Sequence, residues 1–524
     1  MSEIEVILLL LGLVALLTVV AKRVGIAYPI LMTIGGLALG LIPGTPRVEL
    51  PPEFVFLLFL PPILFAAAFF TSPRELRLNA RPIALLAIGL VLATTVVVGL
   101  LVHALVPEIG WAPAFALGAI VSPPDAVAAT AIARRLGLPR QAVTILEGES
   151  LVNDATALVA LRLAIAAAVT GTFSLAEAAG SFVLVSVGGV AIGLGVGWLL
   201  VQVESRLNDP PVEVLVSLLG PFAAWIPAES VHVSGVLAVV TAGIVLGRAA
   251  PRVMSSDTRV LGSGVWQMAI YITNGLVFIL IGLQLPTILD DLSARWTPAE
   301  LAVLAVTVSG AVIAVRLAWV YPGIYLPRVL AAVRRRDPPP SPRIVLIIGW
   351  AGMRGVVSLA AALALPLDMP GRDLLLFLTF TVILATLVGQ GLTLPLLIRR
   401  LGIGDDGSVQ HEELHARQAS EAAALDRLET LAREWPGHLE LIDQLRGQHE
   451  HAVDHLEHAH DEESGEAGER PLDQEMIEHA AMRRAVIDAQ RVAIIDLRDR
   501  GAIGEEALRR VERDLDLEEL RGEG

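Results

Sequence analysis

Residues 148–154 read Gly-Glu-Ser-Leu-Val-Asn-Asp and lie inside an apolar run long enough to form a membrane-spanning helix. Ionisable groups are costly at that depth, and by default they mark function. At helical spacing, Ser150 and Asp154 share one face of the helix, and Glu149 and Asn153 share the adjacent face. We interpret the first face as an oxygen site for a small cation and the second as scaffolding for that site.

The composition of the whole chain is typical of a membrane protein. Of its 524 residues, 54% are hydrophobic, and the mean hydropathy is +0.66. The net charge of -15 is unevenly spread: residues 1–400 hold 25 basic and 22 acidic residues, whereas residues 401–524 hold 14 and 32. We therefore predict a transmembrane domain over 1–400 and an acidic cytoplasmic tail over 401–524. The absence of cysteine excludes disulfides and thiolate metal sites.

Apolar periodicity predicts an all-α polytopic membrane protein with about 13 transmembrane helices and a helical tail. The predicted spans are 5–21, 27–42, 54–70, 82–105, 111–133, 141–169, 178–203, 212–228, 231–248, 264–288, 300–321, 344–366 and 373–398. The predicted tail helices are 411–434, 438–460, 473–499 and 504–520.

The distribution of basic residues predicts the orientation of the spans. With the N-terminus outside, the cytoplasmic connections carry 17 Lys and Arg residues and the outer connections carry three. This positive-inside bias places the C-terminus in the cytoplasm. The first span has acidic residues before it and basic residues after it, the reverse of a signal peptide, so we expect it to be retained in the cell membrane.

Two predicted spans contain helix-breaking residues at matching places in the two halves of the chain. In the fifth span, residues 122–125 read Ser-Pro-Pro-Asp, and the prolines remove two backbone donors. In the twelfth, residues 349–355 contain three glycines around Arg354. Broken helices at equivalent positions of two repeats indicate a substrate site near the membrane midplane of a secondary transporter.

Three stretches of the sequence resemble a known family. They are GAIVSPPDAVAATAIARRLGLPRQAVTILEGESLVNDATALVA, GMRGVVSLAAALALP and LVGQGLTLPLL, which occupy 118–160, 352–366 and 387–397. Their residues and their order resemble the bacterial monovalent cation:proton antiporters related to animal sodium/proton exchangers. The resemblance extends over about residues 1–400.

The resemblance implies a fold with two inverted six-helix repeats and a homodimer. It implies that core helices, over about 82–169 and 300–398, move against interface helices, over about 5–70 and 212–288. It also implies exchange of Na⁺, or another monovalent cation, for H⁺ across the membrane. No cofactor is expected beyond the transported ions.

The resemblance also assigns roles to the polar residues of the sixth span. Asp154 is implied to bind the cation or the proton, and Ser150 is implied to be a cation ligand. Asn153 stands where electrogenic relatives have a second Asp, which favours electroneutral exchange of one cation for one proton. Glu149 is implied to form a structural ion pair with Arg354.

The break in the fifth span contributes two further candidates for the ion site. Asp125 matches an acidic residue of the family, although a carboxylate there is also suited to capping the half-helix that follows. Relatives often have Thr at the position of Pro124, where its hydroxyl contributes to the ion site. Because proline has no such group, a backbone carbonyl or water must replace it here.

Competition between the cation and the proton for Asp154 can be argued from charge alone. A bare carboxylate crosses hydrocarbon at a high cost, whereas one neutralised by a proton or a cation crosses readily.

Two other classes of membrane protein share some of these features. An intramembrane aspartyl protease would use Asp125 and Asp154, but neither is preceded by Gly-x-Gly. A cation channel would use the same polar path but needs no titrating carrier.

Overall fold

The computed structural model describes residues 3–42, 55–171, 174–292, 295–326, 340–404, 408–463 and 472–500, together with residues 511 and 515. The described residues form helices joined by short turns and loops, and none of them lies in a strand. The chain divides into two compact units, Met1–Asp406 and Gly407–Gly524. The prediction of an all-α membrane protein is confirmed.

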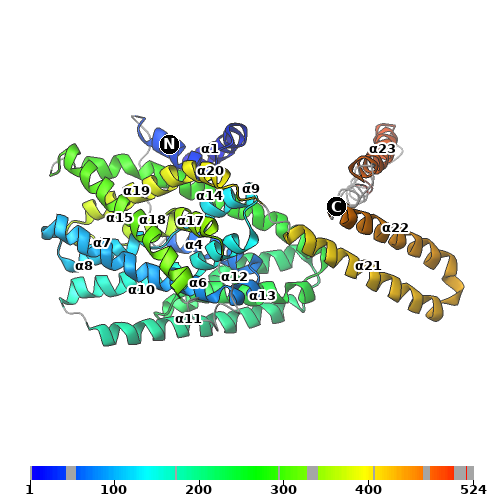
Figure 1. Ribbon diagram of the computed structural model, residues 1–524, viewed down its shortest axis with the longest axis horizontal. Coiled ribbons are helices and arrows are strands. Elements are labelled where there is room, and N and C mark those ends of the chain that lie inside the picture. The colour runs from blue at the N-terminus through cyan, green and yellow to red at the C-terminus, as the bar shows by residue number, and fades with distance from the viewer. Residues whose placement is uncertain are drawn as a thin grey trace. The chain divides into compact units, whose positions relative to one another are not determined.

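The helices of the first unit follow the predicted spans in order (Figure 1). They are α1 (Glu3–Val24), α2 (Tyr28–Gly40), η1 (Val55–Phe59), α4 (Leu60–Phe70), α5 (Pro73–Leu78), α6 (Ala80–Ala84), η2 (Leu85–Leu90), α7 (Val91–Leu105), η3 (Pro107–Ile109), α8 (Trp111–Val121), α9 (Ala126–Arg135), α10 (Arg140–Thr170), α11 (Leu175–Glu204), α12 (Pro210–Ser230), α13 (Gly235–Val253), α14 (Ser256–Leu292), α15 (Pro298–Tyr325), α17 (Pro342–Trp350), α18 (Val356–Leu363), α19 (Arg372–Leu384), η5 (Ala385–Gln390) and α20 (Gly391–Leu401).

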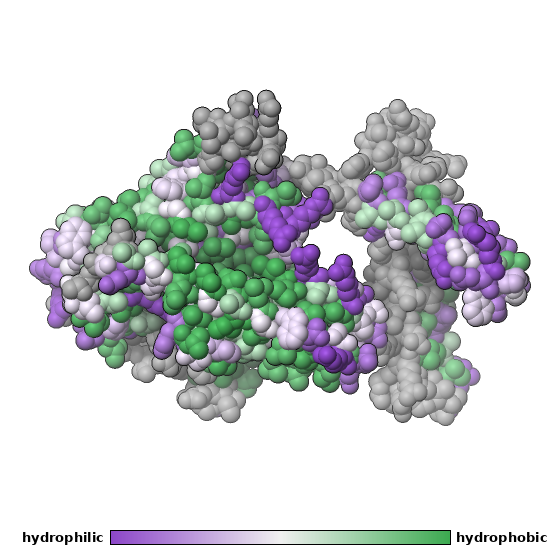
Figure 2. Space-filling model, turned by 90° about the horizontal axis from the view of Figure 1, so that it is seen from below, coloured by the Kyte–Doolittle hydropathy of each residue, from purple (hydrophilic) through white to green (hydrophobic). Residues whose placement is uncertain are grey.

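Most of these helices have the length and composition of membrane spans. Within the described residues, ten are long and apolar enough to cross a bilayer, and two shorter apolar helices cover Tyr28–Gly40 and Leu57–Phe70. The twelfth predicted span is the broken pair α17 and α18. Large apolar side chains remain exposed on α1, α7, α11 and α12, and Figure 2 shows hydrophobic residues gathered over the face of this unit that it presents. Such a surface suits contact with lipid.

Short polar residues set where several of these helices begin. The hydroxyl of Ser234 accepts a hydrogen bond from the Leu237 N–H at 3.2 Å at the start of α13. Thr297 and Glu300 form a reciprocal capping box at the start of α15. These bonds satisfy N–H groups that a helix leaves without intrahelical partners.

The fifth and twelfth spans are both broken, and their breaks lie against each other. The first break separates α8 from α9, and the second separates α17 from α18. The N–H of Asp125, in the first break, donates to the carbonyl of Met353, in the second, at 2.7 Å. Figure 1 shows α17 and α18 near the middle of the unit. The breaks therefore form one crossing inside the bundle.

Helix α10 runs beside this crossing, between two hydrophobic clusters. Ile145 and Leu161 of α10 belong to a cluster that includes side chains from α7, α8, α15, α18 and α19. Leu151 and Ala155 belong to a second cluster, with side chains from α4, α12 and α13. Leu158 packs against both clusters. The polar residues of α10 thus lie where two packed bodies meet.

The second unit consists of α21 (Ser408–Glu434), η6 (Pro436–His438), α22 (Leu439–Glu463) and α23 (Leu472–Asp499). Helices α21 and α22 form a hairpin around Pro436, and the ring of His449 contacts Glu421 across it at 2.6 Å. These helices coincide with three of the four predicted tail segments. The fourth, 504–520, lies almost entirely outside the described residues.

Close approach at the crossing requires glycine at position 355. A Cβ atom placed there would overlap the carboxylate of Asp125. We predict that Gly355→Ala lowers the free energy of unfolding by about 1–3 kcal/mol, as overpacking does in other cores. The measurement is thermal unfolding of the purified protein in detergent.

The matched control is Gly310→Ala in α15, where an added Cβ would meet nothing within 4 Å. Alanine favours helix more than glycine does, so this variant should be at least as stable as the parent. Equal stability of both variants would contradict the close packing of Gly355 against Asp125.

Candidate ion-binding site

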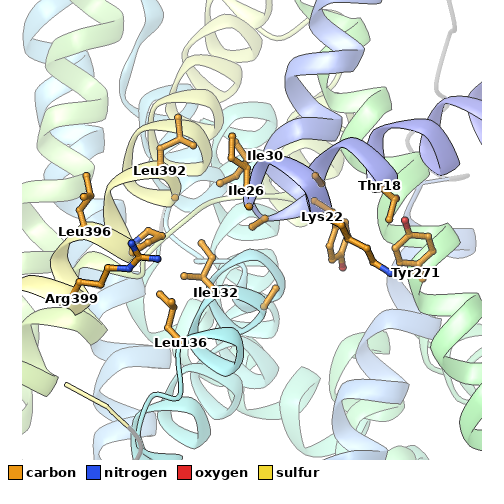
Figure 3. Close-up of a pocket in the computed structure, with 17 residues that line it drawn as sticks. Thr18, Lys22, Ile26, Ile30, Ile132, Leu136, Tyr271, Leu392, Leu396 and Arg399 are labelled. Carbon is orange, nitrogen blue, oxygen red and sulfur yellow. The ribbon is translucent and has the colours of Figure 1, made fainter. Parts of the chain in front are cut away.

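Two cavities adjoin at Tyr28 and Ala131. One, of about 600 Å³, is mostly apolar and carries Lys22 and Arg399 (Figure 3). Among the described residues that line it there is no carboxylate, so the charges of Lys22 and Arg399 repel cations. The other, of about 500 Å³, contains several carboxylates and is the candidate site.

The second cavity brings together four of the residues singled out in the sequence. Ser150 and Asp154 line it from α10, and Pro124 and Asp125 line it from the break in the fifth span. Walls from α4, α14 and the start of α18 complete it. Segments far apart in the chain therefore bring the Ser150 hydroxyl, the Asp125 and Asp154 carboxylates and a helix break to one cavity.

Asp154 is buried but has no polar partner. Its exposed fraction is 4%, and among the described residues its side chain makes neither a hydrogen bond nor an ion pair. Burying an uncompensated carboxylate is costly, so proteins normally pair it or keep it protonated. Asp154 is therefore available to a proton or to a cation.

Asp125 joins the two halves of the crossing through its side chain. One carboxylate oxygen accepts the Val127 N–H at 2.9 Å, at the start of α9. The other accepts the Val356 N–H at 3.4 Å, at the start of α18. Asp125 thus caps both half-helices, and their positive ends stabilise its negative charge.

Asn153 does not line the cavity. It is fully buried, and its side-chain amide donates to the carbonyl of Pro124 at 2.9 Å. This bond ties α10 to the break in the fifth span and gives a donor to a carbonyl of that break. The two faces of α10 thus differ: Ser150 and Asp154 reach the cavity, whereas Glu149 and Asn153 reach the surrounding protein.

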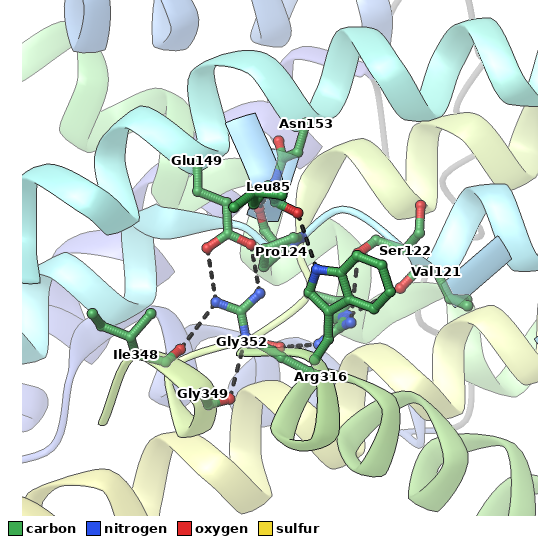
Figure 4. A network of polar contacts seen from close by, with 12 residues as sticks. Leu85, Val121, Ser122, Pro124, Glu149, Asn153, Arg316, Ile348, Gly349 and Gly352 are labelled. Atoms are coloured by element: carbon green, nitrogen blue, oxygen red, sulfur yellow. Dashed lines mark hydrogen bonds and ion pairs between the residues drawn. The ribbon is translucent and has the colours of Figure 1, made fainter. Parts of the chain in front are cut away.

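The predicted ion pair between Glu149 and Arg354 is wrong. Glu149 pairs with Arg316 of α15, whose two terminal nitrogens contact its two carboxylate oxygens at 2.6 and 2.8 Å (Figure 4). Both side chains are almost completely buried. Arg316 also donates to the carbonyls of Gly349 and Ile348, at the end of α17. One guanidinium therefore connects α10, α15 and the break in the twelfth span.

Arg354 instead serves the carbonyls that the two breaks expose. Its guanidinium donates to the carbonyls of Val121 at 3.0 Å and Ser122 at 3.5 Å, and to that of Gly352. Its own backbone N–H donates to the hydroxyl of Thr386 at 3.0 Å. An interrupted helix leaves carbonyls without N–H partners, and the nearest arginine supplies donors to them.

The need of these exposed carbonyls for donors could have been used to predict the role of Arg354 from the sequence. Because Arg354 lies inside a break, its donors are needed there, which leaves Arg316 as a buried cation for Glu149. Glu147 and Asn274 are polar residues that line the cavity but were not among the predicted site residues. Glu147 lies on α10 about 10 Å from Asp154 by helical rise. Asn274 of α14 is buried, and its side-chain oxygen has no partner among the described residues.

A bundle of membrane spans with two crossed, broken helices beside a buried carboxylate is the architecture of a secondary transporter. Comparison with protein families identifies the kind of secondary transporter. The profile described as "Sodium/hydrogen exchanger, transmembrane" matches residues 7–400, and the chain belongs to this family.

Individual relatives agree with this assignment. An uncharacterized Na⁺/H⁺ exchanger of Mycobacterium tuberculosis is 37% identical over 98% of this chain and 95% of its own. A sodium, potassium, lithium and rubidium/H⁺ antiporter of Bacillus subtilis is 35% identical over 75% of this chain and 61% of its own. The solved sodium proton antiporter of Methanocaldococcus jannaschii superimposes with a TM-score of 0.60 at 18% identity, over 76% of this chain and 98% of its own. It has the same fold.

The revised ion pair predicts how substitutions combine. We expect Arg316→Met to cost about 3–5 kcal/mol of stability, because it strands the buried Glu149 carboxylate. Adding Glu149→Gln should recover part of that loss. The measurement is the yield and the thermal unfolding of each purified variant.

The matched comparison combines Glu149→Gln with Arg354→Met. Glu149 and Arg354 share no hydrogen bond or ion pair among the described residues but lie close enough to interact electrostatically, so recovery in this double variant should be smaller than in the variant with Arg316→Met. Recovery in this double variant, and none in the variant with Arg316→Met, would contradict the pairing with Arg316.

Proposed function

We propose that the protein exchanges Na⁺, or another monovalent cation, for H⁺ at Asp154, one ion for one proton. Asp154 and Ser150 supply oxygen ligands to the transported cation, and the proton binds the same carboxylate. The observation that carries this proposal is a buried Asp154 that faces a cavity without a polar partner among the described residues.

Exchange follows if the cation and the proton compete. A protein body that carries a bare carboxylate past hydrocarbon meets a large barrier, whereas the same body with either ion bound does not. The loaded forms therefore cross and the empty form does not. Each return of the carrier requires an ion, so a sodium gradient drives protons in the opposite direction.

Three of the polar residues around Asp154 support a count of one titrating group. The charge of Glu149 is matched by Arg316, and the two bonds from helix ends stabilise the charge of Asp125. Asn153 adds a neutral amide where a second acid would add a charge. With Asp154 as the exchanging carboxylate, one cation replaces one proton and no net charge moves.

We further propose which parts move. The core helices, over about 82–169 and 300–398, carry the crossing and Asp154 past the interface helices, over about 5–70 and 212–288. The cavity supports this division, because α4 and α14 line it opposite α10. The N-terminus faces outward, the C-terminus is cytoplasmic, and two copies form a dimer through the interface helices.

The relatives leave several cations open as substrates. The name of the Bacillus subtilis relative lists sodium, potassium, lithium and rubidium. The present site holds a proline at 124, whose carbonyl is already bonded to Asn153.

Proton flux in sealed vesicles, read with a pH dye after adding Na⁺, K⁺ and Li⁺ in turn, tests exchange and ranks the cations. Absence of cation-driven proton flux would overturn the proposal.

Asp154→Asn tests the carboxylate directly. Asparagine is nearly isosteric but holds neither a proton nor a full negative charge, so both loaded forms of the carrier disappear. We predict normal membrane insertion and no cation-driven proton flux, and weak flux with altered cation affinity for Asp154→Glu. The control, Asp209→Asn, makes the same change at an exposed position before α12 and should keep full flux. Strong flux from Asp154→Asn would refute the mechanism.

Competition for one carboxylate also predicts how transport responds to pH. While Asp154 is largely protonated, the apparent affinity for the cation should rise up to about tenfold for each unit of pH, because the ligand must lose its proton first. The maximal rate at saturating cation should change much less. The measurement is the half-saturating cation concentration across a pH series in proteoliposomes. A constant value over that series would contradict competition.

A further inference from the structure

The stripe of α10 that carries the ion site continues to the far end of the helix. Ser150, Asp154, Leu158 and Arg162 follow one another at intervals of four residues, so each neighbours the next and together they form a stripe that winds slowly around the helix. In the proposed orientation, α10 runs from the cytoplasm outward, and Arg162 lies on the outer side of Asp154.

This stripe borders two separate cavities. Ser150 and Asp154 line the cavity of about 500 Å³ already described, whereas Leu158 and Arg162 line another of about 420 Å³. Only one helical turn, about 6 Å, separates Asp154 from Leu158 along the helix. The outer cavity therefore ends one turn away from the ion site.

The outer cavity is bridged by an ion pair. A terminal nitrogen of Arg162 contacts both carboxylate oxygens of Glu229, at 2.9 Å each. Arg162 belongs to α10, in the proposed moving core, and Glu229 belongs to α12, in the proposed interface domain. The Trp225 and Ile226 side chains of α12 line the same cavity.

We propose that Arg162 and Glu229 form an outer latch and that the cavity of about 420 Å³ is the outer vestibule of the transport path, separated from Asp154 in this conformation. This inference rests on the proposed function. The latch holds α10 against α12 while the inner cavity reaches Asp154. When the core moves, the pair separates, and the freed Glu229 carboxylate presents a negative charge that attracts cations to the vestibule.

The expected size of the effect is modest. The side chains of Arg162 and Glu229 are 46% and 36% exposed, and such pairs alter an equilibrium by about twofold to fivefold. A latch of this strength biases the carrier toward one side without blocking its turnover.

The absence of cysteine allows a direct test. Ala155 lies beside Asp154, is 4% exposed and packs in the second hydrophobic cluster, so Ala155→Cys reports opening of the outer path. The measurement is the rate at which a membrane-impermeant maleimide labels this cysteine from outside in right-side-out vesicles. We expect about twofold to fivefold faster labelling when Arg162→Gln or Glu229→Gln is added.

The charge swap Arg162→Glu with Glu229→Arg should return the rate to that of Ala155→Cys alone. The control is Arg372→Gln, which changes another arginine on the outer side, one that donates to the Leu365 and Leu363 carbonyls. It should leave the labelling rate unchanged. Unchanged labelling in both neutral variants, or equally fast labelling in the swapped variant, would overturn the latch.

Sodium-driven proton flux of the unaltered chain, measured in the same vesicles, separates the two claims. Flux together with unchanged labelling in the neutral variants would overturn the latch alone. Absence of flux from the unaltered chain would overturn the proposed function.

Discussion

Every polar group that the two helix breaks expose inside the membrane needs a partner within the protein, because the hydrocarbon supplies none. The breaks meet this requirement by crossing. Asp125 accepts N–H groups at the start of both half-helices, and Arg354 donates to carbonyls of both breaks. At the crossing, polar groups of the two breaks therefore satisfy one another's hydrogen bonds. Helix α10 is held beside the crossing by the bond from Asn153 to the Pro124 carbonyl.

This arrangement explains how neighbouring carboxylates on α10 have different fates. Glu149 turns toward α15, where Arg316 neutralises it and fixes the end of α17. Asp154 turns the other way, into a cavity between the two hydrophobic clusters, and finds no partner among the described residues. The paired charges make a rigid frame, and the unpaired carboxylate is left for the transported ions.

Apolar runs and helix breakers were sufficient to predict the spans and the two breaks, because both signals are local: length decides a span, and Pro123, Pro124 or Gly355 decides a break. The pairing of Glu149 was not local. Arg316 lies 167 residues further along the chain, and its contact depends on how α15 is rotated and packed. The bond from Asn153 to Pro124 was missed for the same reason, because it requires two helices to meet at a particular depth.

The central claim is that one carboxylate carries either one cation or one proton. The most direct measurement is the balance point of exchange in proteoliposomes with imposed sodium and proton gradients at several clamped voltages. The account predicts that net proton flux vanishes when the sodium and proton concentration ratios are equal, at every voltage. A balance point that moves with voltage, or that falls at unequal ratios, would contradict it.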